Sequence, residues 1–283
     1  MADGKARNAR RAALGLSLVF AAWLLGTWPP PFWWRDHWPR QTAMMQWTHA
    51  RYGGASPSYR PVALADVGPY LQRLLIIAED SRFRSHCGID VVELKEAAGV
   101  PPDAGLWRTA GAMWGQRNRI RGASTITQQL AKNLYLSPSR SLLRKLKEAV
   151  IAIRLELALS KDRILELYLN TVEWGPGVWG VDRAAREYFG VPPAALDLRQ
   201  AASLAATLPH PRASNPAYRP TRMAARRDLI LARYYGYDVV IPPSELVAEL
   251  PDIKIELPPV IIPPALESLR IDSLMPGDTT KGP

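Results

Sequence analysis

The sequence predicts a mostly α-helical protein. Apolar residues recur at helical spacing in several runs, and residues that commonly cap helices precede many of those runs. No alternation of strand-like and helix-like segments is visible, so a parallel sheet is not expected. The 283 residues, 47% of them hydrophobic, suffice for one sizeable domain with appended segments.

The amino-terminal segment has the features of a membrane anchor. Basic residues dominate positions 1–11, and a charge-free run at 12–34 follows them. Pro29 should end the helical part of this run, leaving about 17 residues, the lower limit for crossing a hydrocarbon core. The basic flank predicts a cytoplasmic start, and the tryptophans of the run resemble an interfacial belt. A cleaved signal peptide is the alternative, and either interpretation leaves the rest of the chain outside the cytoplasm.

The next part of the chain combines an irregular stretch with two helices. Residues 35–63 lack a strong periodicity and are interpreted as a connector. A helix should follow and deliver Glu79 and Asp80 at its end, and Asp90 should cap another. The stretch 106–119 is left open between a short helix and a mobile loop.

Two consecutive helices are expected in the middle of the chain. Thr125 and Gln128 match a capping box, which predicts a helix to about Leu136. A longer helix should run from Ser139 to Leu159. Its buried side is predicted from the helical period to consist of Leu142, Leu143, Leu146, Ala149, Val150, Ile153 and Leu157.

The last third of the predicted domain is also helical. Ser160 should cap a helix, and a glycine-rich tight turn should follow at 175–180. Further helices are expected at 181–188, 198–208 and 221–235. The tail, residues 238–283, contains three Pro-Pro pairs and is predicted to be extended.

Positive charge is concentrated in one window. No Asp or Glu occurs from Ala104 to Lys147, whereas nine cations do, and the whole chain carries a net charge of +10. Such a field attracts an anionic partner, although a solvated basic helix face would give the same pattern. Gln128 and Gln129 lie side by side within the window and are hard to explain by packing alone. The single cysteine, Cys87, excludes an intramolecular disulfide and any cysteine-based metal site.

Four blocks of sequence indicate a family. Residues 79–88 match EDxxFxxHxG, residues 122–133 match GxSTxTQQxxKN, residues 144–148 match RKxxE, and residues 161–170 match KxxILxxYLN. In this order the chain resembles the family-51 glycosyltransferases that polymerise peptidoglycan. It is most similar to their monofunctional form, because the SxxK and KTG patterns of a penicillin-binding domain do not occur in the sequence.

This resemblance carries expectations about fold, location and partners. It implies a lysozyme-like, two-lobed helical catalytic domain at residues 64–237 and one N-terminal transmembrane helix. It implies a single-pass protein of the bacterial inner membrane, with the catalytic domain on the periplasmic side. The partners would be lipid II, the nascent glycan strand and membrane lipids. Other cell-wall synthesis or division proteins stay open as partners, and nucleic acid is not expected.

The resemblance also implies a mechanism. Glycan transfer removes a proton from an acceptor 4-hydroxyl while a lipid pyrophosphate leaves the donor, which calls for a carboxylate base and for cations. By resemblance Glu79 is the base, and Glu148 is a second catalytic carboxylate that either assists the leaving group or holds the cations in place. The substrate-binding residues implied are Ser124, Gln128, Gln129, Lys132, Arg140, Arg144 and Lys145.

Other motif residues are expected to be structural, and some matters stay open. Asp80 should orient its loop through backbone hydrogen bonds, with His86 as a structural partner, and Glu166 and Asn170 should tie helices together. Lys145 is left open between the substrate and membrane headgroups. No cofactor or metal is certain, and a divalent cation (Mg²⁺) assisting the pyrophosphate is left open. The rival functions are a lysozyme-like glycan-cleaving enzyme and an inactive membrane-tethered scaffold.

Overall fold

The computed structural model describes residues 2–53, 58–115, 124–139 and 141–241. These residues are mostly helical, as the sequence predicts, and their strands form one short antiparallel hairpin, β1 (Glu173–Gly175) and β2 (Val178–Trp179), at the predicted glycine-rich turn. The α-helices are α1 (Ala2–Leu25), α2 (Ala43–Tyr52), α3 (Pro69–Glu79), α4 (Val91–Ala97), α5 (Leu106–Gly115), α6 (Ile126–Tyr135), α7 (Leu142–Ala158), α8 (Lys161–Thr171), α9 (Val181–Phe189), α10 (Leu198–Thr207) and α11 (Pro220–Tyr234).

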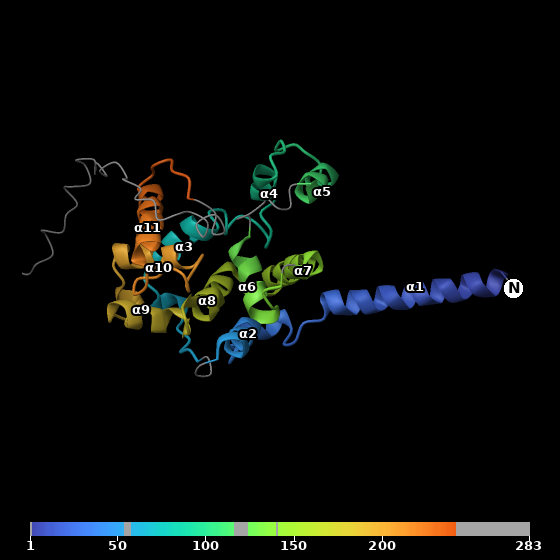
Figure 1. The fold of residues 1–283 in the computed structure, drawn as a ribbon, viewed down its shortest axis with the longest axis horizontal. Helices are drawn as coiled ribbons and strands as arrows, with labels where there is room; N and C mark the ends of the chain where they lie inside the picture. Colours follow the sequence, from blue (N-terminus) through green and yellow to red (C-terminus); the bar gives the residue numbers. More distant parts are fainter. Residues whose placement is uncertain (1, 54–57, 116–123, 140, 242–283) are drawn as a thin grey trace, which may run out of the picture. The chain divides into compact units, whose positions relative to one another are not determined.

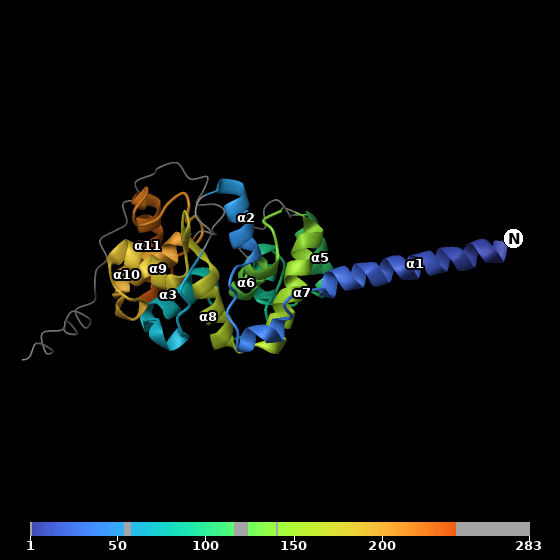
Figure 2. The same cartoon turned by 90° about the horizontal axis from the view of Figure 1, so that it is seen from below.

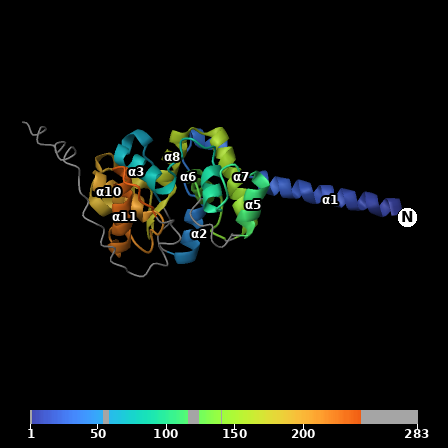
Figure 3. The same ribbon diagram turned by 90° about the horizontal axis from the view of Figure 1, so that it is seen from above.

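The helices of the domain pack in two groups. Helices α3, α10 and α11 contact one another, and α2, α7 and α8 contact α6 (Figure 1). The same grouping is visible from below (Figure 2) and from above (Figure 3). One continuous hydrophobic core joins the two groups, with Phe83, Tyr168 and Trp174 among its fully buried side chains. The domain therefore holds residues from both groups in fixed relation to each other.

Helix α6 begins where its predicted capping box places it. The Thr125 hydroxyl accepts from the Gln128 backbone N–H, and the Gln128 side chain accepts from the Thr125 N–H, both at 3.1 Å. These bonds satisfy donors that would otherwise be unpaired at the helix start. Ile126 and Leu130 are fully buried, so the cap and the core together fix the rotation of α6.

Helix α3 ends at Glu79, as predicted, and the following residue links it to α6. The Asp80 carboxylate accepts from the Ile126 backbone N–H at 2.9 Å and lies 2.9 Å from Nε2 of His86. The predictions that Asp80 orients its loop and that His86 is a structural partner are thus confirmed. Glu79 is therefore held beside the start of α6 although the two segments are distant in sequence.

The predicted buried side of the helix that became α7 is wrong. Leu142, Leu143, Leu146, Ile153 and Leu157 are between 40% and 80% exposed. Instead, the core-facing residues are Glu148, Ile151, Ala152 and Leu155. The helix is apolar on more than one side, so its period alone cannot select the inner face, and ion pairs allow an acidic residue to face inward. The helix also begins three residues later than predicted.

The segment predicted as an irregular connector, residues 35–63, contains a helix. Thr42 caps α2 by accepting from the Met45 N–H at 3.1 Å, and the fully buried Met45 lies in a helix that packs against α6. The end of this segment is fixed by Asn170, whose amide exchanges two 2.9 Å hydrogen bonds with the backbone of Val62. Asn170 therefore ties α8 to an extended segment of the chain, and not to another helix as predicted.

Helix α1 carries exposed apolar side chains, including Leu14, Leu18 and Phe20. Among the residues that the structure describes, no helix combines the length and the apolar character needed to cross a membrane. The transmembrane helix expected at residues 12–34 stays a prediction. Arg140 and most of the Pro-rich tail, from residue 242 onward, lie outside the described residues.

Candidate active site

A cavity of about 380 Å³ lies where α3, α4, α6 and α11 converge. We call it the α3–α6 cavity. Its lining residues are Ile77, Ala78, Glu79, Asp80, Ser81, Arg82, Glu93, Glu96, Ser124, Gln129, Lys132, Leu208, Pro209, Arg226, Arg233 and Ile241. Both helix groups of the domain contribute to this lining, so the cavity depends on the folded domain as a whole.

Glu79 is held from both of its carboxylate oxygens. Its side chain is 7% exposed, and Gln129 Nε2 donates to Oε2 at 3.0 Å. Arg226 Nη2 donates to Oε1 at 3.1 Å. The Tyr168 hydroxyl in turn donates to Gln129 Oε1 at 2.9 Å, and burial raises the pKa of Tyr168 well above its usual 10. The carboxylate is thereby oriented while its remaining lone pairs stay available.

Lys132, on α6, also lines the cavity, and we call its part of the lining the cationic end. Burial lowers the pKa of Lys132, and the neighbouring Lys145 and Arg144 add to this, whereas Glu148 and Glu79 act in the opposite direction. Within the described part of the chain, no hydrogen bond or ion pair joins the Lys132 ammonium to another residue. Burial removes water that would stabilise the charge of the ammonium. An anionic ligand next to it would supply that stabilisation, so such a cation attracts anions.

Glu148 holds two of the predicted cations. Its buried carboxylate contacts Nη1 of Arg144 and lies 2.5 Å from Nζ of Lys145, which also donates to Oγ of Ser124 at 2.8 Å. Glu148 itself does not belong to the cavity lining. The geometry therefore favours the interpretation in which Glu148 fixes the positions of cations over one in which it contacts the leaving group.

The structure separates the predicted site residues into sets. Glu79, Ser124, Gln129 and Lys132 line the α3–α6 cavity, and Lys145 reaches it through Ser124. Gln128, predicted to bind substrate, is only 4% exposed, and its side chain caps α6 without lining the cavity. The capping box that predicts the helix start also explains this position.

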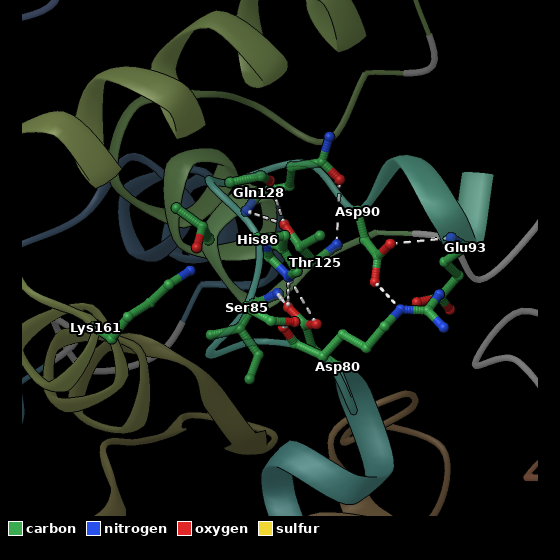
Figure 4. A network of polar contacts seen from close by, with 12 residues as sticks. Asp80, Ser85, His86, Asp90, Glu93, Thr125, Gln128 and Lys161 are labelled. Carbon is green, nitrogen blue, oxygen red and sulfur yellow. Dashed lines mark hydrogen bonds and ion pairs between the residues drawn. The ribbon is translucent and has the colours of Figure 1, made fainter. Parts of the chain in front are cut away.

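A polar network lies beside the cavity (Figure 4). Asp80, His86 and Asp90 offer ligand atoms within 4.8 Å of one another and could hold a metal ion on distance alone. However, Asp80 already accepts from His86 and from a backbone N–H, and Asp90 lies 2.6 Å from Nε of Arg82. A guanidinium at that distance repels a metal cation. The group does not fit a resident Mg²⁺, and we derive no catalytic step through one.

Arg226 and Tyr168 are the site residues that sequence reasoning missed. Arg226 shares the buried face of α11 with Met223 and Ile230, at the spacing of a core stripe. An arginine in such a stripe is a signal for a buried anionic partner, because an unpaired buried charge is costly. The partner itself, Glu79, could not be identified from that spacing.

Comparisons with known proteins agree with this arrangement. A family model described as transglycosylase matches residues 48–235, which is most of the described domain. The chain belongs to the transglycosylase family. It is 38% identical over 235 residues to a biosynthetic peptidoglycan transglycosylase of Thiobacillus denitrificans, covering 82% of this chain and 94% of that protein. A protein of the same description from Azoarcus is 39% identical over 78% of this chain and 91% of its own length.

A longer relative shares only the matched domain. Penicillin-binding protein 1A of Escherichia coli is 42% identical over 173 residues, which cover 61% of this chain and 19% of that protein. Membership of the transglycosylase family gives this chain the activity of a peptidoglycan glycosyltransferase. The α3–α6 cavity, whose lining includes a carboxylate and a cation, has the composition that such a transfer needs.

Proposed function

We propose that this chain polymerises lipid II into linear peptidoglycan strands with Glu79 as the base. The growing chain is transferred from its lipid pyrophosphate to the 4-hydroxyl of the acceptor. One observation carries the proposal: Glu79 and Lys132 line the same cavity, and the carboxylate is fixed by two donors. A general base and a stabiliser of the leaving anion are the two groups that this reaction requires.

At the acceptor end, Glu79 takes the hydroxyl proton as the acceptor oxygen bonds to the donor's anomeric carbon. The bond from that carbon to the pyrophosphate oxygen breaks in the same displacement. Attack from the side opposite the leaving group inverts the configuration at this carbon. The negative charge of the reaction moves from Glu79 to the departing pyrophosphate, so cations are needed at the far end.

At the donor end, Lys132 is the predicted substrate-binding cation that lines the cavity, and Ser124 contributes a hydroxyl. Lys145 and Arg144 lie behind Ser124, fixed by Glu148. Arg140 belongs to this set on sequence grounds alone. Arginine offers a planar fork that matches phosphate oxygens, and lysine offers a point charge.

We also propose that residues 12–34 anchor the chain in the inner membrane and place the domain at 64–237 on the periplasmic face. The exposed apolar residues of α1 and the outward leucines of α7 support this arrangement. Arg154, on α7, donates to the Leu25 carbonyl and to Thr27 Oγ1, at 3.1 Å for the latter. The two apolar surfaces are thus adjacent, as contact with one lipid layer requires.

The remaining expectations complete the proposal. Residues 1–11 would lie in the cytoplasm, 35–63 would join the anchor to the domain, and 238–283 would form a Pro-rich extension. Membrane lipids, the nascent strand and other cell-wall synthesis or division proteins would be its partners.

The decisive experiment incubates purified full-length protein with lipid II and compares it with Glu79→Gln. We expect at least a ~10²-fold loss of polymer formation, in the range that general-base catalysis contributes. The matched control is Glu173→Gln, because the Glu173 side chain is only 12% exposed, pairs with an arginine, Arg212, and lies outside the cavity. It should retain polymerisation.

Other outcomes point to the rival functions. Equal polymer from the wild type and Glu79→Gln would remove Glu79 from the base role. Wild-type protein that binds membranes but makes no polymer would favour the scaffold. Shortening of preformed glycan strands by the wild type would favour the glycan-cleaving enzyme.

A further inference from the structure

We propose that Arg226 and Tyr168 are positioning residues that hold the Glu79 carboxylate in its reactive orientation. Neither residue belongs to the predicted site, and they come from different helices, α11 and α8. The inference rests on the proposed role of Glu79 as base. It deepens that role by naming the groups that keep the carboxylate of the base aligned.

Arg226 acts on one oxygen of the carboxylate. Its Nη2 lies 3.1 Å from Oε1 of Glu79 and 3.1 Å from the carbonyl oxygen of Ala78. One guanidinium nitrogen therefore ties the Glu79 side chain to the backbone of its own helix. Both charged side chains are at least nine-tenths buried, being 5% and 7% exposed. A buried pair with this geometry has little freedom, and loss of one member would leave the other as an unpaired buried charge.

Tyr168 acts on the second oxygen through Gln129. The Tyr168 hydroxyl donates to Gln129 Oε1 at 2.9 Å, which leaves Gln129 Nε2 to donate to Glu79 Oε2 at 3.0 Å. A reversed amide would set two oxygens against each other and leave the hydroxyl without its acceptor. Because burial keeps the Tyr168 hydroxyl protonated, it remains a donor across the working pH range.

This arrangement leaves room for the acceptor substrate. A carboxylate offers about four lone-pair sites, and the two donors use one on each oxygen. The proton of the acceptor hydroxyl moves to a remaining site while the acceptor oxygen forms its bond to the donor carbon. Misplacing a reacting group by about 1 Å can cost ~10²-fold in rate, so loss of either donor should slow the reaction without removing the base.

The first test compares Arg226→Gln and Arg226→Lys in full-length protein, with lipid II as substrate. The matched control is Arg227→Gln, because Arg227 is in the same helix and pairs with Asp228 outside the cavity. We expect kcat to fall ~10- to 100-fold in both Arg226 variants, with KM within about threefold of the wild type. Arg226→Lys should retain more kcat than Arg226→Gln, because it keeps a cation beside Oε1 of Glu79.

A loss of kcat with KM unchanged, partly rescued by the conservative variant Arg226→Lys, is a readout that a merely structural role would not give. Arg226→Gln with the kcat of Arg227→Gln would overturn the inference and leave the proposed function intact. Wild-type protein that makes no polymer would instead overturn the proposed function itself.

A second variant covers the outcome in which Arg226→Gln does not fold. Tyr168→Phe keeps the ring and removes only the hydroxyl, and we expect a ~3- to 10-fold fall in kcat with KM unchanged. In a Gln129→Ala background the same change should have no further effect, because Tyr168 acts through Gln129. Wild-type kcat in Tyr168→Phe, or full additivity with Gln129→Ala, would overturn the role of Tyr168.

Discussion

The two ends of the α3–α6 cavity differ in how complete they are. At the Glu79 end, both carboxylate oxygens already have donors, and the residues that hold it come from three helices of the core. At the Lys132 end, an ammonium with a lowered pKa has no hydrogen bond or ion pair within the described residues. The Glu79 carboxylate is thus preorganised by the fold, whereas under the proposed function the cationic end would be completed by its anionic ligand.

This difference has a physical reason. A general base needs a fixed direction toward one proton, so rigidity favours it. A pyrophosphate with a lipid attached has to enter and then leave as a product. A cationic end already neutralised by acids would bind it weakly, and Glu148 accordingly lies behind the cations, outside the cavity lining.

The largest expected effect comes from removing the central cation. Lys132→Ala should lower kcat/KM for lipid II by ~10²- to 10³-fold, the usual cost of losing one group that stabilises developing charge. Lys95→Ala is the control, because Lys95 donates to a backbone carbonyl at 2.6 Å outside the cavity. A Lys132→Ala enzyme within twofold of this control would show that the cationic end does not bind the leaving group.

Substitution of Glu148 should have a smaller effect on activity and should also lower the stability of the folded state. Glu148→Gln keeps the shape and removes the charge that fixes Arg144 and Lys145, so polymerisation should fall ~10-fold or more while the folded state loses about 3 kcal/mol. Polymerisation and urea unfolding measure the two effects separately. The exposed pair of Arg183 and Glu187 supplies the control, and Glu187→Gln should change stability by less than about 1 kcal/mol. Unchanged activity in Glu148→Gln would show that the positions of Arg144 and Lys145 do not matter for the reaction.

The sequence predicts the parts of this comparison that depend on local chemistry. Thr125 and Gln128 fix the start of α6, because a capping box acts within four residues. Motif positions then place Glu79 at the end of α3. Each of these predictions needs only neighbours in sequence.

The parts that could not be predicted depend on tertiary contacts. Arg226 meets Glu79 across 147 positions, and no periodicity encodes that pairing. The inner face of α7 was mispredicted because Leu143 and Leu157 have the same helical spacing as a core stripe, although they face outward. Gln128 was assigned to substrate because motif membership does not distinguish a capping side chain from a binding one.

The pH dependence of donor binding sharpens the comparison further. An ammonium holds pyrophosphate only while protonated, so binding is present below its pKa and lost as pH rises through it. Because burial lowers the pKa of Lys132, kcat/KM should decline on the alkaline side at a pH below the usual lysine pKa of 10.5. Lys132→Arg should retain activity within ~10-fold at neutral pH and abolish that limb, since arginine stays charged. An unchanged alkaline limb in Lys132→Arg would assign the titration to another group.

The smallest effect is expected on the outer face of α7, the helix that carries Arg144, Lys145 and Glu148 behind the cationic end. Leu143 and Leu157 are 55% and 80% exposed, so changing both to serine should alter the free energy of unfolding by no more than about 1 kcal/mol. If this face contacts the lipid layer from which the donor arrives, the double variant should bind phospholipid vesicles several-fold more weakly and raise KM for lipid II, with kcat unchanged. If neither vesicle binding nor KM changes, the outer face of α7 does not contact the lipid layer. The donor would then reach the cavity from solution, as the acceptor could.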